Sequence, residues 1–77
     1  MVDDIKEILE INLGESIEIK IWFDRTLRGV LEGYDDHLNL YLKDSKDVSD
    51  PENVVDIGDI VLRGDTVVMV RSLETDS

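Results

Sequence analysis

Three polar side chains stand close together in the middle of the sequence: Asp35, His37 and Asn39. They follow a glycine that permits a tight bend, and they precede an alternating run of leucines typical of a strand. His37 is the only histidine, and the amide of Asn39 can both donate and accept hydrogen bonds. Asp35 and His37 could share one strand face, where the carboxylate would orient the imidazole. An aspartate and a lone histidine at a turn are also common as a structural feature, so the cluster is either a site or a polar corner.

A second polar turn lies near the C-terminus, where Gly64 permits a tight bend between Arg63 and Asp65. If the two turns meet at one end of the fold, the imidazole of His37 and the guanidinium of Arg63 could face one another. Planar groups of this kind stack on nucleobases at about 1 to 3 kcal/mol per base, and an amide can read a base edge. The two turns therefore favour binding of single-stranded RNA, which would not require a general basic patch.

Patterns that indicate catalysis are absent from the sequence. There is no cysteine, no Gly-x-Ser-x-Gly elbow and no glycine-rich phosphate loop between a strand and a helix. Nothing distinguishes a catalytic carboxylate pair, and so small a fold offers no deep cleft. Residues 44–53 contain spaced aspartates, but Lys46 and Val48 occupy positions where a calcium loop supplies ligands. We expect a protein that is not an enzyme and that has no metal and no cofactor.

The length predicts one domain over residues 1–77. A chain of this size buries only about 60% of its unfolded surface, so its core is marginal without further stabilisation. Because the chain has no cysteine, disulfides are excluded and oligomerisation is the remaining means. No apolar run approaches the roughly 20 residues that span a bilayer, and the N-terminus lacks the pattern of a signal peptide. We expect a cytoplasmic protein without membrane contact.

The charge is strongly acidic, with 8 Lys and Arg against 19 Asp and Glu and a formal net charge of −11. Non-specific affinity for nucleic acid comes from basic groups that displace counterions. The net charge alone therefore argues against a broad phosphate-binding surface. A high-salt habitat and a basic protein partner are both compatible with this acidity.

The spacing of apolar residues predicts a helix followed by five strands. The helix is expected over residues 3–13, with Asp3 or Asp4 as its cap and Gly14 at its end. Strands, the variable loop and the tail are then assigned from period, turn residues and polarity. The strands are expected at 16–23, 26–34, 38–43, 54–62 and 66–71, the loop at 44–53 and the tail at 72–77.

Glycines and apolar faces indicate how these strands fold together. Gly29 and Gly33 interrupt the second strand, and glycines within strands commonly mark bulges or bends. The last two strands are apolar on both faces, which indicates that another subunit covers one face or edge. The element order predicts a mainly β protein, a short N-terminal α-helix followed by a five-stranded antiparallel barrel of SH3-like type.

Two stretches resemble the motifs of Sm and Sm-like (LSm) proteins. Residues 17–43, with Gly29 and the run from Gly33 to Leu40, resemble the Sm1 motif. Residues 57–68, within the segment 54–71, resemble the Sm2 motif. The two motifs in this order, separated by a variable loop, cover nearly the whole chain together with the helix. The dipeptide at 63 and 64 favours the archaeal and eukaryotic type over the bacterial Sm-like RNA chaperone.

This resemblance implies the Sm fold, a strongly bent five-stranded barrel. It also implies a homo-oligomeric ring, with seven subunits expected and six as the alternative, in which the fourth strand of one subunit pairs with the fifth of the next. Uridine-rich single-stranded RNA would bind at the rim of the pore. The ring would act as a scaffold or chaperone in RNA processing.

The family motif also implies a role for each polar residue of the two turns. His37 and Arg63 would sandwich a base, and Asn39 would hydrogen-bond its edge. Asp65 would assist near the second turn. These four residues are the expected RNA-binding residues.

Two further residues would support them, since Asp35 would brace the first loop and Gly64 would form the second turn. Structural roles remain the alternative for the polar residues. Asn39 could simply cap a loop, Arg63 could form a surface or intersubunit ion pair, and Asp35 and Asp65 could form turns.

The sequence departs from the family pattern at several positions. Asp24 stands where the family usually has glycine, Leu38 replaces the common methionine, and Thr66 replaces the common asparagine. Trp22 and Phe23 could present an aromatic group to a partner or to RNA. The alternative function is an acidic ring or assembly platform that receives basic protein partners and binds RNA weakly or not at all.

Overall fold

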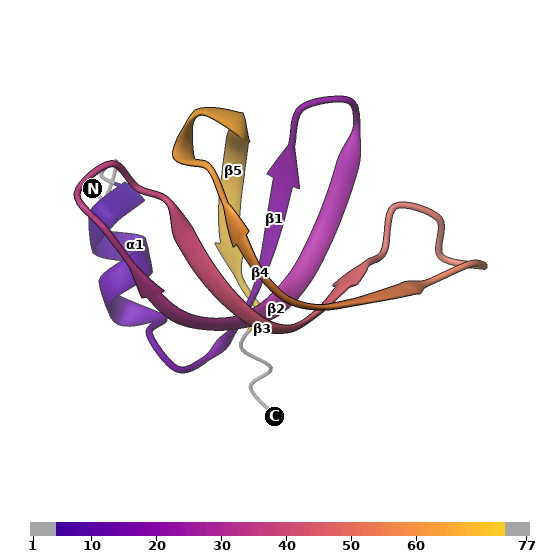
Figure 1. Cartoon of the computed structure of the whole chain (residues 1–77), viewed down its shortest axis with the longest axis horizontal. Helices are drawn as coiled ribbons and strands as arrows, with labels where there is room; N and C mark the ends of the chain where they lie inside the picture. The colour runs from indigo at the N-terminus through magenta and orange to yellow at the C-terminus, as the bar shows by residue number, and fades with distance from the viewer. Residues whose placement is uncertain (1–4, 74–77) are drawn as a thin grey trace.

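The protein folds as a short helix followed by one strongly bent antiparallel sheet (Figure 1). The computed structural model describes residues 5–73. Along the sheet the strand order is β4-β3-β2-β1-β5, so β4 and β5 form its two edges. The predicted helix and five-stranded bent antiparallel sheet are therefore confirmed. The elements are α1 (Ile5–Ile11), β1 (Ser16–Ile21), β2 (Arg25–Tyr34), β3 (Leu40–Asp47), β4 (Val55–Leu62), the 3-10 turn η1 (Gly64–Thr66) and β5 (Val67–Ser72).

Helix α1 is stabilised by its contacts with the core, because it is too short to be stable by itself. Leu9 is completely buried, and Ile5 and Ile8 pack against the core from the same face. Asn12 is buried just beyond the helix and donates a 2.8 Å hydrogen bond from its side chain to the carbonyl of Ile8. Seven residues are too few for a stable isolated helix, so these contacts are what order it.

The helix and the C-terminal tail differ from the prediction at their ends. The helix ends at Ile11, two residues before the predicted end at 13, and Gly14, with a φ of 85°, lies in the turn that follows. The predicted caps, Asp3 and Asp4, lie outside the described residues, as do positions 74–77 of the predicted tail. That tail was predicted to start too early, because Ser72 is still paired in β5.

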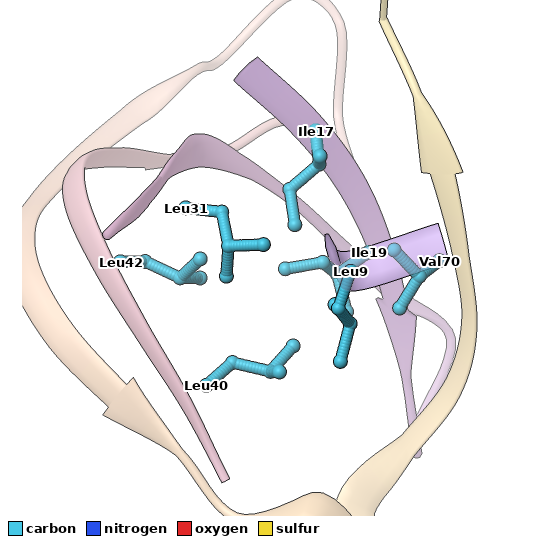
Figure 2. Packing of buried hydrophobic residues seen from close by; sticks show 7 residues of the cluster. All are labelled: Leu9, Ile17, Ile19, Leu31, Leu40, Leu42 and Val70. Carbon is cyan, nitrogen blue, oxygen red and sulfur yellow. The ribbon is translucent and has the colours of Figure 1, made fainter. Parts of the chain in front are cut away.

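The core lies inside the curve of the sheet, and the helix contributes Leu9 to it (Figure 2). Alternating residues of β1, β2 and β3 point inward, as the period-2 pattern predicts, and β5 adds one side chain. The buried cluster consists of Leu9, Ile17, Ile19, Leu31, Leu40, Leu42 and Val70.

Strand β3 begins later than the predicted range of 38–43. It starts at Leu40, because Leu38 has a φ of 63° and belongs to the turn before the strand. The main-chain N–H of Leu38 donates to the carbonyl of Asp35 at 2.9 Å, which closes this turn. The bounds of the other four strands agree with the prediction to within two residues, although Arg25, predicted in a turn, already belongs to β2.

Strand β3 also ends later than predicted, and the loop expected over 44–53 was wrong in its first four residues. Asp47 still pairs with Leu27 on one side and with Val55 on the other. The inward positions here are Ser45 and Asp47, both buried. The loop was predicted because this half of the strand has polar side chains at positions that are buried in the structure.

The loop that remains is tied to the start of β2. Asp47 accepts hydrogen bonds from the hydroxyl of Ser49 at 2.6 Å and from its main-chain N–H at 3.0 Å, and it contacts the guanidinium of Arg25. The hydroxyl of Ser49 in turn accepts from the N–H of Thr26 at 2.8 Å. The hydrogen bonds from Ser49, followed by Arg25, hold the pKa of Asp47 below its ordinary value.

The paired strands β2 and β3 approach each other closely at Gly29 and Ser45. The pairing register shifts beside Gly29 and again beside Ser45. A Cβ atom on Gly29 would lie 2.6 Å from Oγ and 3.3 Å from Cα of Ser45. The two backbones can approach only because residue 29 lacks a side chain. The buried hydroxyl of Ser45 has no hydrogen-bond partner among the described residues.

Replacing either member of this pair should change stability in opposite directions. Gly29→Ala should lower the free energy of unfolding by about 1 to 3 kcal/mol, because the new methyl group collides with Ser45. Ser45→Ala should leave that free energy unchanged or raise it by about 1 kcal/mol, because it removes an unsatisfied buried hydroxyl. Urea unfolding followed by circular dichroism measures both.

The double variant tests whether the two effects share one contact. Gly29→Ala should cost less in the Ser45→Ala background, since the closest atom, Oγ, is then absent. Simple additivity of the two free-energy changes would contradict this account of the bend.

Candidate nucleic-acid interface

The turn between β2 and β3 and the turn after β4 are in direct contact. Oδ1 of Asn39 accepts a 2.9 Å hydrogen bond from the main-chain N–H of Gly64. A Cβ atom at position 64 would lie 2.4 Å from the carbonyl oxygen of His37 and 2.8 Å from that of Leu38. Those oxygens belong to the backbone and cannot move aside cheaply, so the approach requires glycine. The structure thus brings together the two turns singled out in the sequence.

Asp35 organises the first turn from within. Its Oδ1 accepts hydrogen bonds from the main-chain N–H groups of His37 at 2.9 Å and Asn39 at 3.0 Å. Its Oδ2 accepts from the side-chain amide of Asn39 at 3.0 Å and from the hydroxyl of Tyr41 at 3.2 Å. Four hydrogen bonds on one carboxylate fix the backbone of the turn and the orientation of the Asn39 amide.

These hydrogen bonds favour the ionised form of Asp35. The bond from the main-chain N–H of Asn39 contributes most, and the pKa of the carboxyl lies below its ordinary value of 3.8. The same arrangement raises the pKa of Tyr41 above 10.0, because its hydroxyl donates to a carboxylate. Asp35 is therefore charged and Tyr41 neutral over the whole physiological range.

The side-chain amide of Asn39 is held by hydrogen bonds on two sides, and these bonds occupy only part of its hydrogen-bonding capacity. Its oxygen faces an N–H group of the backbone and its nitrogen faces a carboxylate, so the reverse orientation of the amide would place like groups together. A primary amide has two N–H donors and two acceptor lone pairs. One N–H and one lone pair of Asn39 are thus left for a ligand, in a fixed orientation.

The other predicted site residues are more exposed. His37 is exposed at the tip of the first turn. The guanidinium of Arg63 donates to Oδ2 of Asp65 at 2.8 Å, and 76% of the Arg63 side chain remains accessible. An ion pair this exposed adds little to stability, but it limits the directions that the guanidinium can take. His37 and Arg63 therefore present planar groups to solvent from two turns that touch.

Two aromatic residues join this region: Tyr41, which had no predicted role, and Trp22, which was predicted only as a group that could face a partner or RNA. The ring of Tyr41 packs over Gly33, where an added Cβ would lie 3.3 Å from its Cδ2 atom, and its hydroxyl reaches Asp35. The pairing of Gly33 with Tyr41 across the hairpin would have revealed this contact, but it depends on the register. Trp22 donates from its indole N–H to the carbonyl of Asp65 at 3.1 Å.

Among residues 5–73, no three His, Cys, Asp or Glu side chains are grouped so that they could hold a metal ion. Within the same range, no helix has the length and apolarity needed to cross a membrane.

Comparison with known proteins identifies the family. The model of the LSM domain matches residues 7–72. The chain belongs to the LSM family. A snRNP Sm-like protein of Methanococcoides burtonii is 44% identical to this LSM protein, over 83% of this chain and 89% of the relative. A second Sm-like protein, from Archaeoglobus fulgidus, is 39% identical over 83% of each chain. The predicted relation to archaeal Sm-like proteins is confirmed.

Solved structures show the same fold. The P. aerophilum SmAP1 heptamer matches this LSM protein with a TM-score of 0.84 and 25% identity, over 97% of this chain and 100% of the other. The Sm protein of Pyrococcus abyssii in complex with a uridine heptamer matches with a TM-score of 0.81 and 31% identity, over 91% and 99% of the two chains. The architecture described above is the Sm fold.

The acid dependence of stability should report the network around Asp35. Because its folded-state pKa is depressed, its ionised form stabilises the fold, and this contribution is fully present well above pH 3.8. It should be lost as the pH falls through the lower pKa of the folded state. The stability advantage of the parent over Asp35→Asn, measured by urea unfolding at several pH values, should therefore shrink in acid.

Asp50→Asn is the control, because Asp50 is exposed in the loop after β3 and, among the described residues, its carboxylate accepts a hydrogen bond only from the N–H of Glu52. An Asp35→Asn difference that stays constant down to pH 2 would contradict the proposed network.

Proposed function

We propose that this LSM protein forms a homo-oligomeric ring of seven copies and binds uridine-rich single-stranded RNA at the rim of the pore. It would act as a scaffold or chaperone in RNA processing and perform no chemistry of its own. The contact between the two turns, made by Asn39 and Gly64, is the observation that carries this proposal. The SmAP1 heptamer and the Sm protein bound to a uridine heptamer support the ring and the ligand class.

The base would lie between the planar groups of His37 and Arg63. Stacking of this kind accepts any base, because every base has two aromatic faces. Selection of uracil would come from Asn39, whose unused lone pair and N–H match the N–H and the neighbouring carbonyl of the uracil edge. Cytosine has an acceptor where uracil has that N–H. Because the amide is clamped by Asp35 and Gly64, it cannot turn over to accommodate cytosine.

The surrounding acids serve the site as positioning residues. Asp35 orients Asn39, and Asp65 orients Arg63. Neither carboxylate needs to touch the RNA, because Asp35 already accepts hydrogen bonds from N–H groups and Asp65 is paired with the guanidinium of Arg63. An acidic chain can therefore hold a base without a basic groove.

The ring is supported by the edges of the sheet. β4 and β5 are the two edge strands, and an exposed edge is a template for pairing with another strand. Both strands carry exposed apolar side chains among exposed polar ones, and apolar side chains are unusual on an edge facing water. These side chains are Val55, Ile57 and Val61 of β4 and Val68 and Met69 of β5. Pairing β4 of one subunit with β5 of the next would cover them.

The net charge sets how salt should act on this binding. A ring of seven copies would carry about seven times the subunit charge of −11. Exposed charges more than about 10 Å apart are largely screened at about 0.1 M salt, whereas stacking and hydrogen bonds in the pocket are not. Affinity for RNA should therefore fall only weakly with added salt, or rise at first, and not fall steeply as it does for a basic groove.

Removing either stacking group should weaken RNA binding. His37→Ala and Arg63→Ala should each lower the affinity for a labelled uridine heptamer by about 5- to 150-fold, because each removes one face of the base sandwich. Fluorescence anisotropy at graded salt concentrations measures this. Lys46→Ala is the matched control, since it also removes one exposed positive charge but lies in β3, paired with Asp56.

A loss of RNA affinity in Asn39→Ala would have two causes, because this change also removes the acceptor for the Gly64 N–H and loosens the second turn. An equal loss of affinity in the Lys46→Ala variant would assign the effect to charge alone. If the parent ring binds no oligo-uridine at any salt concentration, the acidity instead favours the alternative, an assembly platform for basic proteins.

The ring should depend on the apolar edge strands. Native mass spectrometry of the parent should show a heptamer, and Val61→Asp or Val68→Asp should shift it to smaller species, because the new carboxylate would be buried without a partner. Val54→Asp is the control, since Val54 is equally apolar and exposed but precedes β4. A parent that stays monomeric at high protein concentration would refute the ring.

A further inference from the structure

The turn between β1 and β2 carries the chain's only tryptophan and only phenylalanine, next to one another. Neither is used by the core: Trp22 is 58% exposed and Phe23 is 89% exposed. Burial of an aromatic ring is its usual contribution to folding. Phe23 gains almost none, so packing within the subunit does not account for it.

This turn is attached to the candidate RNA site. The main-chain N–H of Trp22 donates to the carbonyl of Thr66 at 3.1 Å, and its indole N–H donates to the carbonyl of Asp65 at 3.1 Å. Asp65 is also the residue whose carboxylate holds the guanidinium of Arg63. Figure 1 shows the β1–β2 turn and the β4–β5 connection at the same end of the sheet. Trp22 therefore lies one hydrogen bond away from a residue that positions the proposed base-stacking group.

Phe23 is exposed and has an unfavourable backbone conformation. Phe23 has a φ of 70° and Asp24 a φ of 58°, in the left-handed region. Aspartate is tolerated there, whereas a bulky residue such as phenylalanine is a genuine outlier. A short hairpin connection uses positive φ, which Gly, Asn or Asp normally supplies, so the turn itself does not account for a phenylalanine there. The combination of strain and exposure indicates that the Phe23 ring acts outside the subunit.

The chemistry of the site favours a nucleobase. Single-stranded nucleic acid is bound by aromatic rings on which successive bases stack, and such stacking needs no positive charge. That suits a chain with a net charge of −11, and the site lies beside the proposed base pocket. We propose that Trp22 and Phe23 form a second stacking site, which takes a nucleotide of the same RNA where the strand leaves the pocket at His37 and Arg63.

This inference rests on the proposed function and adds a different specificity to it. The first pocket reads the uracil edge through Asn39. No side-chain amide of the described residues is bonded into the β1–β2 turn, and the indole N–H of Trp22 is already donated to the backbone. The second site should therefore accept any base, purines included, because it offers faces and no edge-reading group.

The test compares a uridine heptamer with the same oligomer extended by several adenosines at either end. Trp22 is the sole tryptophan, so its fluorescence reports base stacking directly. Anisotropy of a label on the RNA reports binding independently. For the parent, an extended oligomer should quench the tryptophan fluorescence and bind roughly fivefold or more tightly than the heptamer.

Variants of Phe23 separate stacking from other contacts. Phe23→Leu should abolish the gain from the extension while leaving affinity for the uridine heptamer unchanged, and Phe23→Tyr should retain the gain. Phe23→Gly should also abolish the gain, yet its melting temperature should be equal to or above that of the parent, because glycine relieves the backbone at a φ of 70°. Asp24→Gly is the matched control, which relaxes the same turn and should keep the gain.

The outcomes distinguish the two proposals. Normal binding of the heptamer without a gain or quenching on extension would overturn the second site and leave the first intact. A gain that survives in Phe23→Leu would overturn it as well, since an apolar contact would then suffice. A melting temperature of Phe23→Gly below that of the parent would assign the ring to folding. Failure of every oligomer to bind the parent would overturn the proposed function and this inference with it.

Discussion

The close approach of two turns, separated in sequence but joined by Asn39 and Gly64, is the constraint on which the site depends. It requires a residue without a side chain at one position and an amide held at a fixed angle at the other. The carboxylate of Asp35 provides that angle, and it does so through hydrogen bonds and not through an ion pair. The arrangement explains how two turns of a very acidic chain keep a fixed polar geometry at the surface, because the Asp35 carboxylate accepts four hydrogen bonds from the groups around it.

The fold was largely readable from the spacing of apolar residues, since β1 and β2 alternate cleanly and the helix shows one apolar face. The third strand was misplaced for two physical reasons. Leu38 leaves the strand because local hydrogen bonds to Asp35 stabilise a left-handed conformation. Ser45 and Asp47 remain in it although they are polar, because the neighbouring strands and Gly29 determine what fits there. Neither cause appears as a periodic pattern.

For the site, the residues of both turns could be predicted from the motifs, but their contacts could not. The hydrogen bond between Asn39 and Gly64 spans 25 positions and depends on the bend of the whole sheet. The contact of Tyr41 with Asp35 depends on the hairpin register, and the attachment of Trp22 to Asp65 depends on pairing between the first and last strands. Spacing along a sequence describes neighbours on one element, and these three contacts each join different elements.

The clamp at the base of the loop after β3 has a consequence for how this protein can diversify. Asp47, Ser49 and Thr26 close the loop at its stem, so the residues beyond them add little to the geometry of the sheet. Lengthening a closed loop costs only a small amount of chain entropy. The tip at 50–53 is therefore a place where extra sequence, an epitope or even an inserted module could be carried on each copy of the chain while the strands and the two polar turns keep their shape.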